Sequence, residues 1–295
     1  MLKKGGKKLG KAKGYIYLLP AIIILSIFVF YPIVYTVINS FDITRGKGFV
    51  FGFDNYVNLL TKNTIFIRSL INTVIYALIV PAISVFLSLI IANTLANLKN
   101  EKIRGFFQSV YFLPYVTSLV AIGIVWSWLF NSEYGIINNI LTSIGFEPIR
   151  WLTDSRYAMI ALIIFAVWKS LAFNTLILTT GIASINPQYY QAAKIDQASN
   201  GTIFRKITVK LVSPMIVYTY IISLIAAFKV YTEAYVLFGD TTLNGSVSTV
   251  VRFIIDSVYK GGNYPLAFAA SVILLVIILS VTMVQKVITR NKIHY

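Results

Sequence analysis

The 295-residue chain is 57% hydrophobic and only 12% charged, with a mean hydropathy of +0.77, which excludes a water-soluble globular protein. A net charge of +16 would suit nucleic-acid binding, so the location of the basic residues decides what that charge does. Cysteine is absent and the one histidine is the penultimate residue, His294, so we predict no disulfide and no metal site.

The first predicted element is a membrane helix that follows a basic tail. Residues 1–14 carry six lysines, and an apolar run then extends from Tyr15 to about Asn39. This run is about twice as long as the apolar part of a signal peptide, and no small-residue cleavage site follows it. A GxxxxGK sequence in the tail lacks both the preceding strand and the following Ser or Thr of a phosphate-binding loop. We therefore expect no nucleotide site here.

Five more apolar runs follow, each longer than the ~20 residues that cross ~30 Å of hydrocarbon. They lie near 69–97, 108–130, 157–181, 211–238 and 264–287. Pro32, Pro81 and Pro114 lie within predicted helices and predict kinks. We predict an all-α integral membrane protein with six transmembrane helices over residues 15–288, and tails at 1–14 and 289–295.

The basic residues fall unevenly on the two faces that six crossings define. The face with both tails and the loops at 98–107 and 182–210 has 16 lysines and arginines, and the opposite loops have 8. Seven of the ten acidic residues lie in those opposite loops. The positive-inside rule therefore predicts that both tails and the 182–210 loop are cytoplasmic. Because the charge sets topology, nucleic acid is not a predicted partner.

A polar segment, the loop at 186–210, separates predicted helices four and five. Asn186 can cap a helix, Pro187 suits its first position and Asn200 with Gly201 supplies a stop, which leaves about 13 residues or roughly 20 Å. Such a helix is too short and too polar to cross a bilayer. Its small residues, Ala192 and Ala193, would allow a partner surface to approach closely. An ordinary amphipathic loop is the alternative interpretation.

This loop resembles the cytoplasmic loop of binding-protein-dependent ABC importer permeases, whose pattern is EAA, three residues, G, nine residues and I-x-L-P. The positions that match in register are Ala192, Ala193 and Ile207. The departures are Gln191 for Glu, Gln197 for Gly and Lys210 for Pro. Across nearly the whole chain, five segments also resemble sugar-importer permeases of the six-helix type. They read GYIYLLPAIIIL with FYPIVYTVINSF, YFLPYVTS, WSWLFNSEYGIINNIL and FKVYTEAYVLFG.

The resemblance implies a coupling helix between helices four and five that docks in a groove of an ATPase subunit. The coupling residues it implies are Tyr189, Gln191, Ala192, Ala193, Asp196, Gln197 and Ala198. It also implies a second, homologous permease, two ATPase subunits that bind ATP and magnesium, and an extracytoplasmic sugar-binding protein. This chain itself would bind no cofactor and catalyse no reaction. It would lie among the lipids of a bacterial cytoplasmic membrane.

Charged residues at membrane depth, Lys169, Lys229 and Glu233, indicate either a transport pathway or a structural ion pair. Lys229 and Glu233 are four residues apart and can pair on one helix face, and either of them can lie near Lys169. Polar and aromatic side chains on the same two helices suit a neutral sugar, which stacks on rings and bonds through its hydroxyls. The predicted pathway residues are Lys169, Ser170, Phe173, Asn174, Ser223, Ala227 and Tyr231. Packing or lipid contact is the alternative role for the aromatic ones.

Two other classes of function are alternatives to an importer permease. A membrane enzyme is disfavoured because no clustered catalytic groups are visible in the sequence. An ion-coupled secondary transporter would use the three intramembrane charges, but the two halves of the chain show no repeat.

The uneven distribution of basic residues predicts on which side of the membrane a single cysteine introduced into this cysteine-free chain will lie. In intact cells, an impermeant thiol reagent should label Ser143→Cys and spare Ser199→Cys. The reverse pattern, or equal labelling at both positions, would exclude the predicted orientation.

Overall fold

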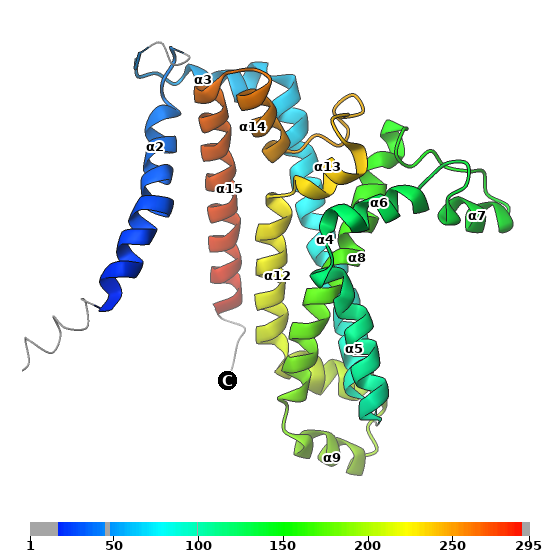
Figure 1. The fold of residues 1–295 in the computed structure, drawn as a ribbon. Coiled ribbons are helices and arrows are strands. Elements are labelled where there is room, and N and C mark those ends of the chain that lie inside the picture. The colour runs from blue at the N-terminus through cyan, green and yellow to red at the C-terminus, as the bar shows by residue number, and fades with distance from the viewer. Residues whose placement is uncertain (1–16, 45–47, 99, 291–295) are drawn as a thin grey trace, which may run out of the picture. The chain divides into compact units, whose positions relative to one another are not determined.

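The computed structural model describes residues 17–44, 48–98 and 100–290, and this part of the chain is helical without a β-strand (Figure 1). The predicted all-α class is confirmed. The tail at 1–14 and residues 291–295 of the second tail lie outside the described residues. The described residues form two compact units, one within 1–62 and 254–273 and the other within 63–253 and 274–295.

Within the described residues, four helices are long and apolar enough to cross a membrane. They are Tyr17–Asn39, α4 (Thr64–Ala96), α8 (Ser155–Ala183) and Tyr264–Val287 within α15 (Tyr264–Arg290). Two bent pairs also meet the criteria for length and composition. α5 (Glu101–Val116) and α6 (Leu119–Leu129) meet at 100°, and residues 200–211 meet α12 (Ser213–Phe228) at 68°. The described residues thus hold four spans, or up to six if each bent pair is one span, and the predicted count of six stays a prediction.

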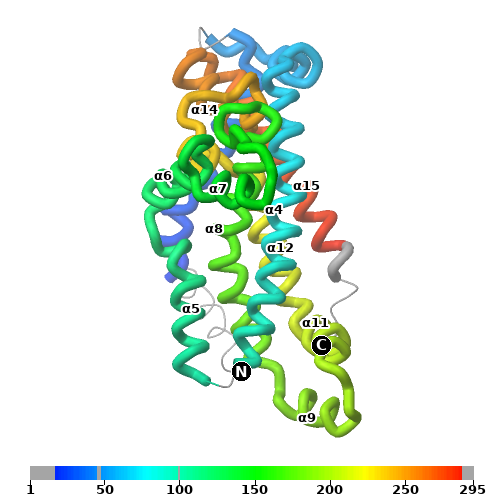
Figure 2. The backbone as a smooth tube through the Cα atoms, turned by 90° about the vertical axis from the view of Figure 1, so that its right-hand side faces the viewer, coloured from blue at the N-terminus to red at the C-terminus, as the bar shows by residue number. Residues whose placement is uncertain are grey.

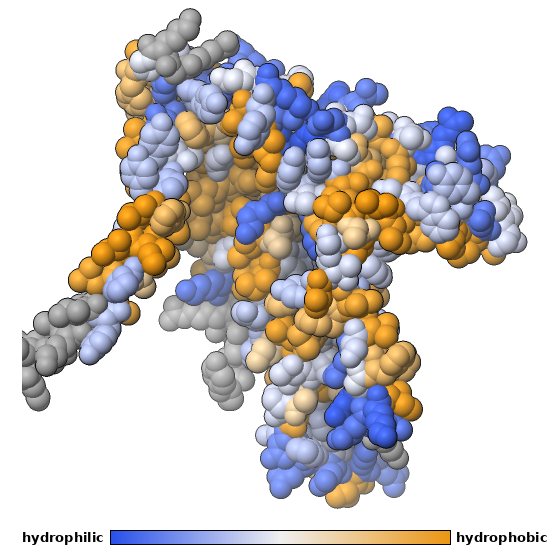
Figure 3. Space-filling model, in the orientation of Figure 1, coloured by the Kyte–Doolittle hydropathy of each residue, from blue (hydrophilic) through white to orange (hydrophobic). Residues whose placement is uncertain are grey.

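The first unit begins with the helix Tyr17–Asn39, which contains the π-helical turn η1 (Ser26–Phe30) and α2 (Tyr31–Asn39). Its apolar side chains are exposed, as expected for a helix surrounded by lipid (Figure 3). A loop and the short α3 (Asp54–Val57) and η2 (Asn58–Lys62) follow. Stacked and edge-on contacts of Phe41 with Phe51 and Phe53, at 5.1 and 5.3 Å between ring centroids, hold this loop together.

The second unit is built on α4 and α8, which pack along their length with α12 against both (Figure 2). The buried face of α4 is rich in small hydroxyl residues, which let helix backbones approach closely where lipid supplies no hydrophobic drive. These residues are Ser69, Thr73, Ser84 and Ser88. At one end of the bundle, Leu89, Leu178 and Val212 form a buried apolar cluster that joins α4 and α8 to the start of α12.

The predicted fifth helix, 211–238, is wrong as a continuous element, because it breaks after Phe228 and resumes as α13 (Thr232–Phe238). Tyr231, at φ −146° and ψ −56°, leaves the helical region. The break frees the carbonyl of Val230, and Thr249 donates its hydroxyl to that carbonyl at 2.9 Å. A later segment of the chain thus replaces the helical bond that the break removes.

The predicted third helix also breaks, at Thr117 and Ser118, three residues after Pro114. Thr117, at φ −75° and ψ 148°, is extended, and the two helices meet there at 100°. Pro114 itself lies within α5, which continues past it to Val116. Pro81 lies inside α4, which continues through it as one helix.

The segment between α6 and α8 contains α7 (Ile136–Ser143) and is organised by one buried amide. Asn138 is 2% exposed, accepts bonds from the backbone of Ile149 and the ring of Trp151, and donates to the carbonyl of Ile149. Asp154 then caps α8, and the hydrogen bonds from Arg156 lower the pKa of Asp154 to about 2. The cap is therefore ionised at neutral pH.

The remaining helices of the second unit follow α8 and α13. They are α9 (Pro187–Ile195), α10 (Asn200–Ile203), η3 (Phe204–Thr208), α11 (Val209–Leu211) and α14 (Val250–Tyr259), the last of which ends in the first unit. Arg252 at the start of α14 donates to the carbonyls of Gly239 and Asp240, both at 2.9 Å. This bonding fixes the loop that leaves α13.

Two glycines predict opposite effects of adding a methyl group. A Cβ at Gly123 of α6 would lie 1.7 Å from Cγ1 of Val236 of α13, whereas one at Gly105 of α5 would meet nothing within 4 Å. Gly123→Ala should therefore destabilise the protein in detergent by about 1–3 kcal/mol, and Gly105→Ala should be neutral or stabilising by up to about 1 kcal/mol. Thermal unfolding of the two variants checks this, and equal stabilities would contradict the α6–α13 contact.

Candidate functional site

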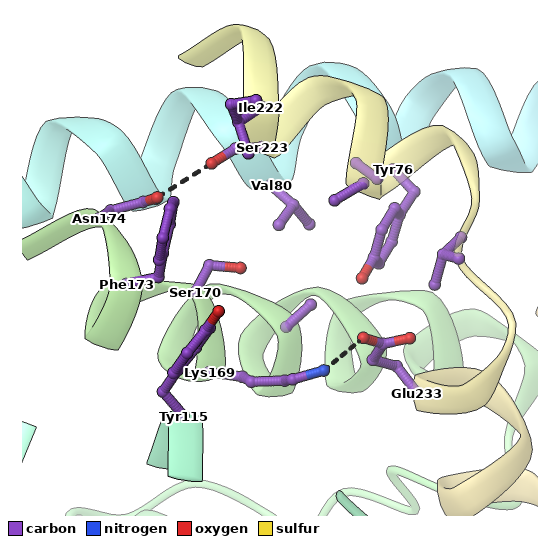
Figure 4. A pocket seen from close by; sticks show the side chains of 14 residues that line it. Tyr76, Val80, Tyr115, Lys169, Ser170, Phe173, Asn174, Ile222, Ser223 and Glu233 are labelled. Atoms are coloured by element: carbon purple, nitrogen blue, oxygen red, sulfur yellow. Dashed lines mark hydrogen bonds and ion pairs between the residues drawn. The ribbon is translucent and has the colours of Figure 1, made fainter. Parts of the chain in front are cut away.

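A cavity of about 280 Å³ opens between α4, α8, α12 and α13, with Tyr115 of α5 at its edge (Figure 4). Its polar groups come from different helices, so the cavity exists only because the helices pack together. Six residues predicted for the pathway line it. They are Lys169, Ser170, Phe173, Asn174, Ser223 and Ala227. Tyr231 does not line it and instead stacks on Tyr235, at 5.7 Å between centroids.

An ion pair lies on one wall of this cavity. The ammonium of Lys169 on α8 lies 2.7 Å from Oε1 of Glu233 on α13, and both side chains are partly buried. The predicted pairing of Lys229 with Glu233 is wrong, because α12 ends at Phe228 and the i, i+4 geometry is lost. Lys229 is exposed and does not line the cavity.

At the other end of the cavity, the side chain of Asn174 joins three helices. Its amide nitrogen donates to Ser84 of α4 at 3.2 Å. Its amide oxygen accepts from Ser223 of α12 at 3.0 Å, the bond drawn in Figure 4. The sequence pattern pointed to Asn174 and Ser223 but missed Ser84. Ser84 is one of several small hydroxyl residues on one face of α4. The sequence shows these residues, but it does not show that their face packs against α8.

Aromatic rings form a flat part of the wall. Tyr115 and Phe173 lie nearly parallel, with 5.6 Å between centroids and 25° between planes. Tyr115 and Tyr76 were not predicted for this site, because they lie on α5 and α4 and reach the cavity only when these helices pack beside α8. The cavity therefore combines a ring surface, hydroxyl and amide groups and a neutralised charge pair. This combination suits an uncharged polar molecule with an apolar face.

α9 lies outside the helical bundle, in the loop that was predicted to couple to an ATPase (Figure 1). Asn186 caps it by accepting from the backbone of Gln188 at 3.0 Å, as predicted. It ends at Ile195 rather than near Asn200, because Gln197 adopts a left-handed conformation with φ 53°. The amides of Gln197 and Ala198 bond back to the carbonyls of Lys194 and Ala193 at 3.1 and 2.9 Å. This is a Schellman end, which normally carries glycine at the left-handed position.

The small residues of α9 do not form one exposed face. Ala192 is exposed, whereas Ala193 is 8% exposed and packed inside the chain. The predicted Ala192/Ala193 docking face is therefore wrong at Ala193, since a partner cannot reach it. The exposed predicted residues are Tyr189, Gln191, Ala192, Asp196 and Gln197, and Ala198 is half-buried.

Comparison with known proteins identifies the family. A family model described as "Binding-protein-dependent transport system inner membrane component" matches residues 84–294. The chain therefore belongs to this family of inner-membrane transport proteins, which confirms the resemblance in the sequence.

The relatives include named permeases. The lactose transport system permease protein LacF of Rhizobium radiobacter is 34% identical, over 78% of this chain and 77% of its own. A probable ABC transporter permease of Mycoplasma genitalium is 31% identical, over 90% of this chain and 82% of its own. The permease in a crystal structure of a bacterial alginate ABC transporter has a TM-score of 0.85 at 23% identity, with 98% of both chains covered. This likeness shows the fold alone.

The ion pair predicts that each single substitution lowers the stability of the protein and that the double substitution restores most of it. Lys169→Met or Glu233→Gln alone leaves one charge without its partner and should destabilise the protein by about 1–3 kcal/mol, allowing for partial exposure. The double variant should recover most of this loss. Thermal unfolding in detergent measures it, with Lys229→Met as the matched control that should have no effect. A double variant no better than the worse single one would exclude the pair as a stabilising contact.

Proposed function

We propose that this chain is the permease subunit of an ATP-driven ABC importer for an oligosaccharide or a related sugar or polyol. The cavity at Lys169–Asn174 is the observation that carries the proposal, because its rings and hydrogen-bonding groups fit a polyhydroxyl molecule. The names of the relatives support it, since LacF is a lactose permease and AraP of Bacillus subtilis an arabinooligosaccharide permease. The chain itself supplies a passage and catalyses no reaction.

The proposed assembly contains a second homologous permease, two ATPase subunits and an extracytoplasmic binding protein. One solved relative is described as an alginate transporter in complex with a periplasmic protein that carries an alginate pentasaccharide, which supports partners of these kinds. ATP and magnesium would bind to the ATPase subunits. The uneven distribution of basic residues supports an orientation with both termini in the cytoplasm.

α9 connects to both helices that form the main walls of the cavity. It follows α8 after three residues, and Tyr190 of α9 shares a hydrogen bond with Thr208 of η3 at 3.2 Å. η3 leads through α11 into α12, and the cluster of Leu178 and Val212 holds α8 against the start of α12. A displacement of α9 by an ATPase subunit would therefore move α8 and α12 together, and with them the cavity walls. The exposed surface at Tyr189 and Ala192 is the proposed point of contact.

The deciding experiment is sugar uptake into proteoliposomes that contain the full complex. Uptake should require ATP and persist when ion gradients are collapsed. Gradient-driven uptake by this chain alone would replace the proposal with an ion-coupled transporter.

A variant of α9 tests the coupling surface within the same assay. Ala192→Arg should reduce ATP-dependent uptake by about tenfold or more, because bulk and charge on an exposed contact block docking without entering the core. Ala192→Ser is the matched control and should retain uptake. Equal uptake by the two variants would show that this surface is not the docking site.

A further inference from the structure

The charged side chains among the described residues that line the cavity are Lys169 and Glu233, and they are bonded to each other. They are 29% and 21% exposed, so a molecule in the cavity can reach both. Because the two opposite charges are 2.7 Å apart, the pair has no net charge, and its field falls off faster with distance than that of a single charge. The wall therefore offers strong donors and acceptors and almost no net charge.

We propose that the Lys169–Glu233 pair makes the cavity a selective site for uncharged vicinal diols, and that it excludes sugars that carry a carboxylate or phosphate. This inference rests on the proposed function and names the charge class of its cargo.

The chemistry of the pair matches neighbouring hydroxyls. The lysine ammonium has three donors and uses one on Glu233, and the carboxylate keeps Oε2 and unused lone pairs of Oε1 as acceptors. Of two adjacent hydroxyls, one can accept from Lys169 while the other donates to Glu233. The hydroxyl of Tyr76 points toward the same wall, and that of Ser170 points into the cavity (Figure 4). The ring of Phe173 supplies a surface for the apolar face of a sugar.

An anionic ligand meets an unfavourable site for two reasons. It approaches the carboxylate of Glu233 together with the ammonium, so repulsion offsets the attraction. If it bound Lys169 directly, it would leave Glu233 as an unpaired charge in a partly buried position. Removing the Glu233 charge should therefore convert the cavity into an anion-accepting site, and removing the Lys169 charge should have the opposite effect.

The test uses Ser170→Cys in the reconstituted complex and three thiol reagents of similar size. Ser170 lines the cavity beside Lys169, and this chain has no cysteine of its own, so mass spectrometry of the chain reads one site. The reagents are methanethiosulfonates with a neutral, a sulfonate and a trimethylammonium group. Dividing the labelling rate of the anionic or cationic reagent by that of the neutral reagent cancels any change in the reactivity of the thiol itself. The same ratios measured on Ser143→Cys, at an exposed position of α7, correct for differences in intrinsic reactivity among the three reagents.

With Lys169 and Glu233 intact, the normalised ratio should lie within about threefold of one. Glu233→Gln should raise anionic labelling by about tenfold, and Lys169→Met should raise cationic labelling by a similar factor. The double variant should return both ratios to the starting values. If a single variant fails to assemble, the proposal is still tested by the labelling ratios of two proteins: the one with Lys169 and Glu233 intact, and the double variant. A strong anion preference with the pair intact, or ratios that no variant changes, would overturn the proposal.

Protection of the thiol introduced by Ser170→Cys from the neutral reagent separates this inference from the proposed function. Methyl glucoside should protect the thiol and glucuronate at equal concentration should not, with the preference reversed when Glu233→Gln is added. Protection by glucuronate with the pair intact would contradict the charge selectivity. Protection by neither would contradict a sugar cargo, while the labelling ratios would still decide whether the pair selects by charge.

Discussion

Backbone amides and carbonyls inside hydrocarbon have no water to bond with, so each departure from helical geometry requires a partner from elsewhere in the chain. The break between α12 and α13 shows how this requirement is met. The carbonyl of Val230 loses its helical partner and accepts from Thr249, nineteen residues further along the chain. The same break turns Glu233 toward α8, where it pairs with Lys169. One local interruption of a helix therefore creates both the loop contact and the charged wall of the cavity.

Close approach of the helices depends on residues with little or no side chain. Gly123 admits Val236 of α13, and Gly181 of α8 lies against Met215 and Val212 at the start of α12. Hydroxyls and one amide supply the directional contacts, as in the bonds of Asn174 to Ser84 and Ser223. In lipid these contacts replace the hydrophobic drive that packs helices in water. They also place polar groups around a cavity, which is how a membrane protein provides a path for a polar molecule.

The loop with α9 combines a common geometry of a helix end with an uncommon residue. The left-handed residue that closes a Schellman end is usually glycine, yet here it is Gln197 at φ 53°. A non-glycine residue in this conformation costs about 1–2 kcal/mol, which the return bonds of Gln197 and Ala198 to Lys194 and Ala193 offset. Gln197 therefore closes α9 in the left-handed conformation that glycine usually adopts at such ends, and it adds a polar side chain beside the exposed surface of α9.

The sequence by itself determined the membrane environment, the all-α class and the family, because long apolar runs and the register of Ala192, Ala193 and Ile207 are local properties of the chain. It also pointed to most of the polar groups of the cavity, since Lys169, Ser170 and Asn174 stand out in an apolar helix. Only the tertiary structure decided how these groups combine. Lys229 was the natural partner of Glu233 by spacing, but the helix ends at Phe228, and the effective neighbour of Glu233 is 64 residues away in sequence. Ala193 had the same small side chain as Ala192, but packing against the rest of the chain buries one and exposes the other. Spacing along a helix defines a face only while the helix continues, and burial depends on which other segment covers that face.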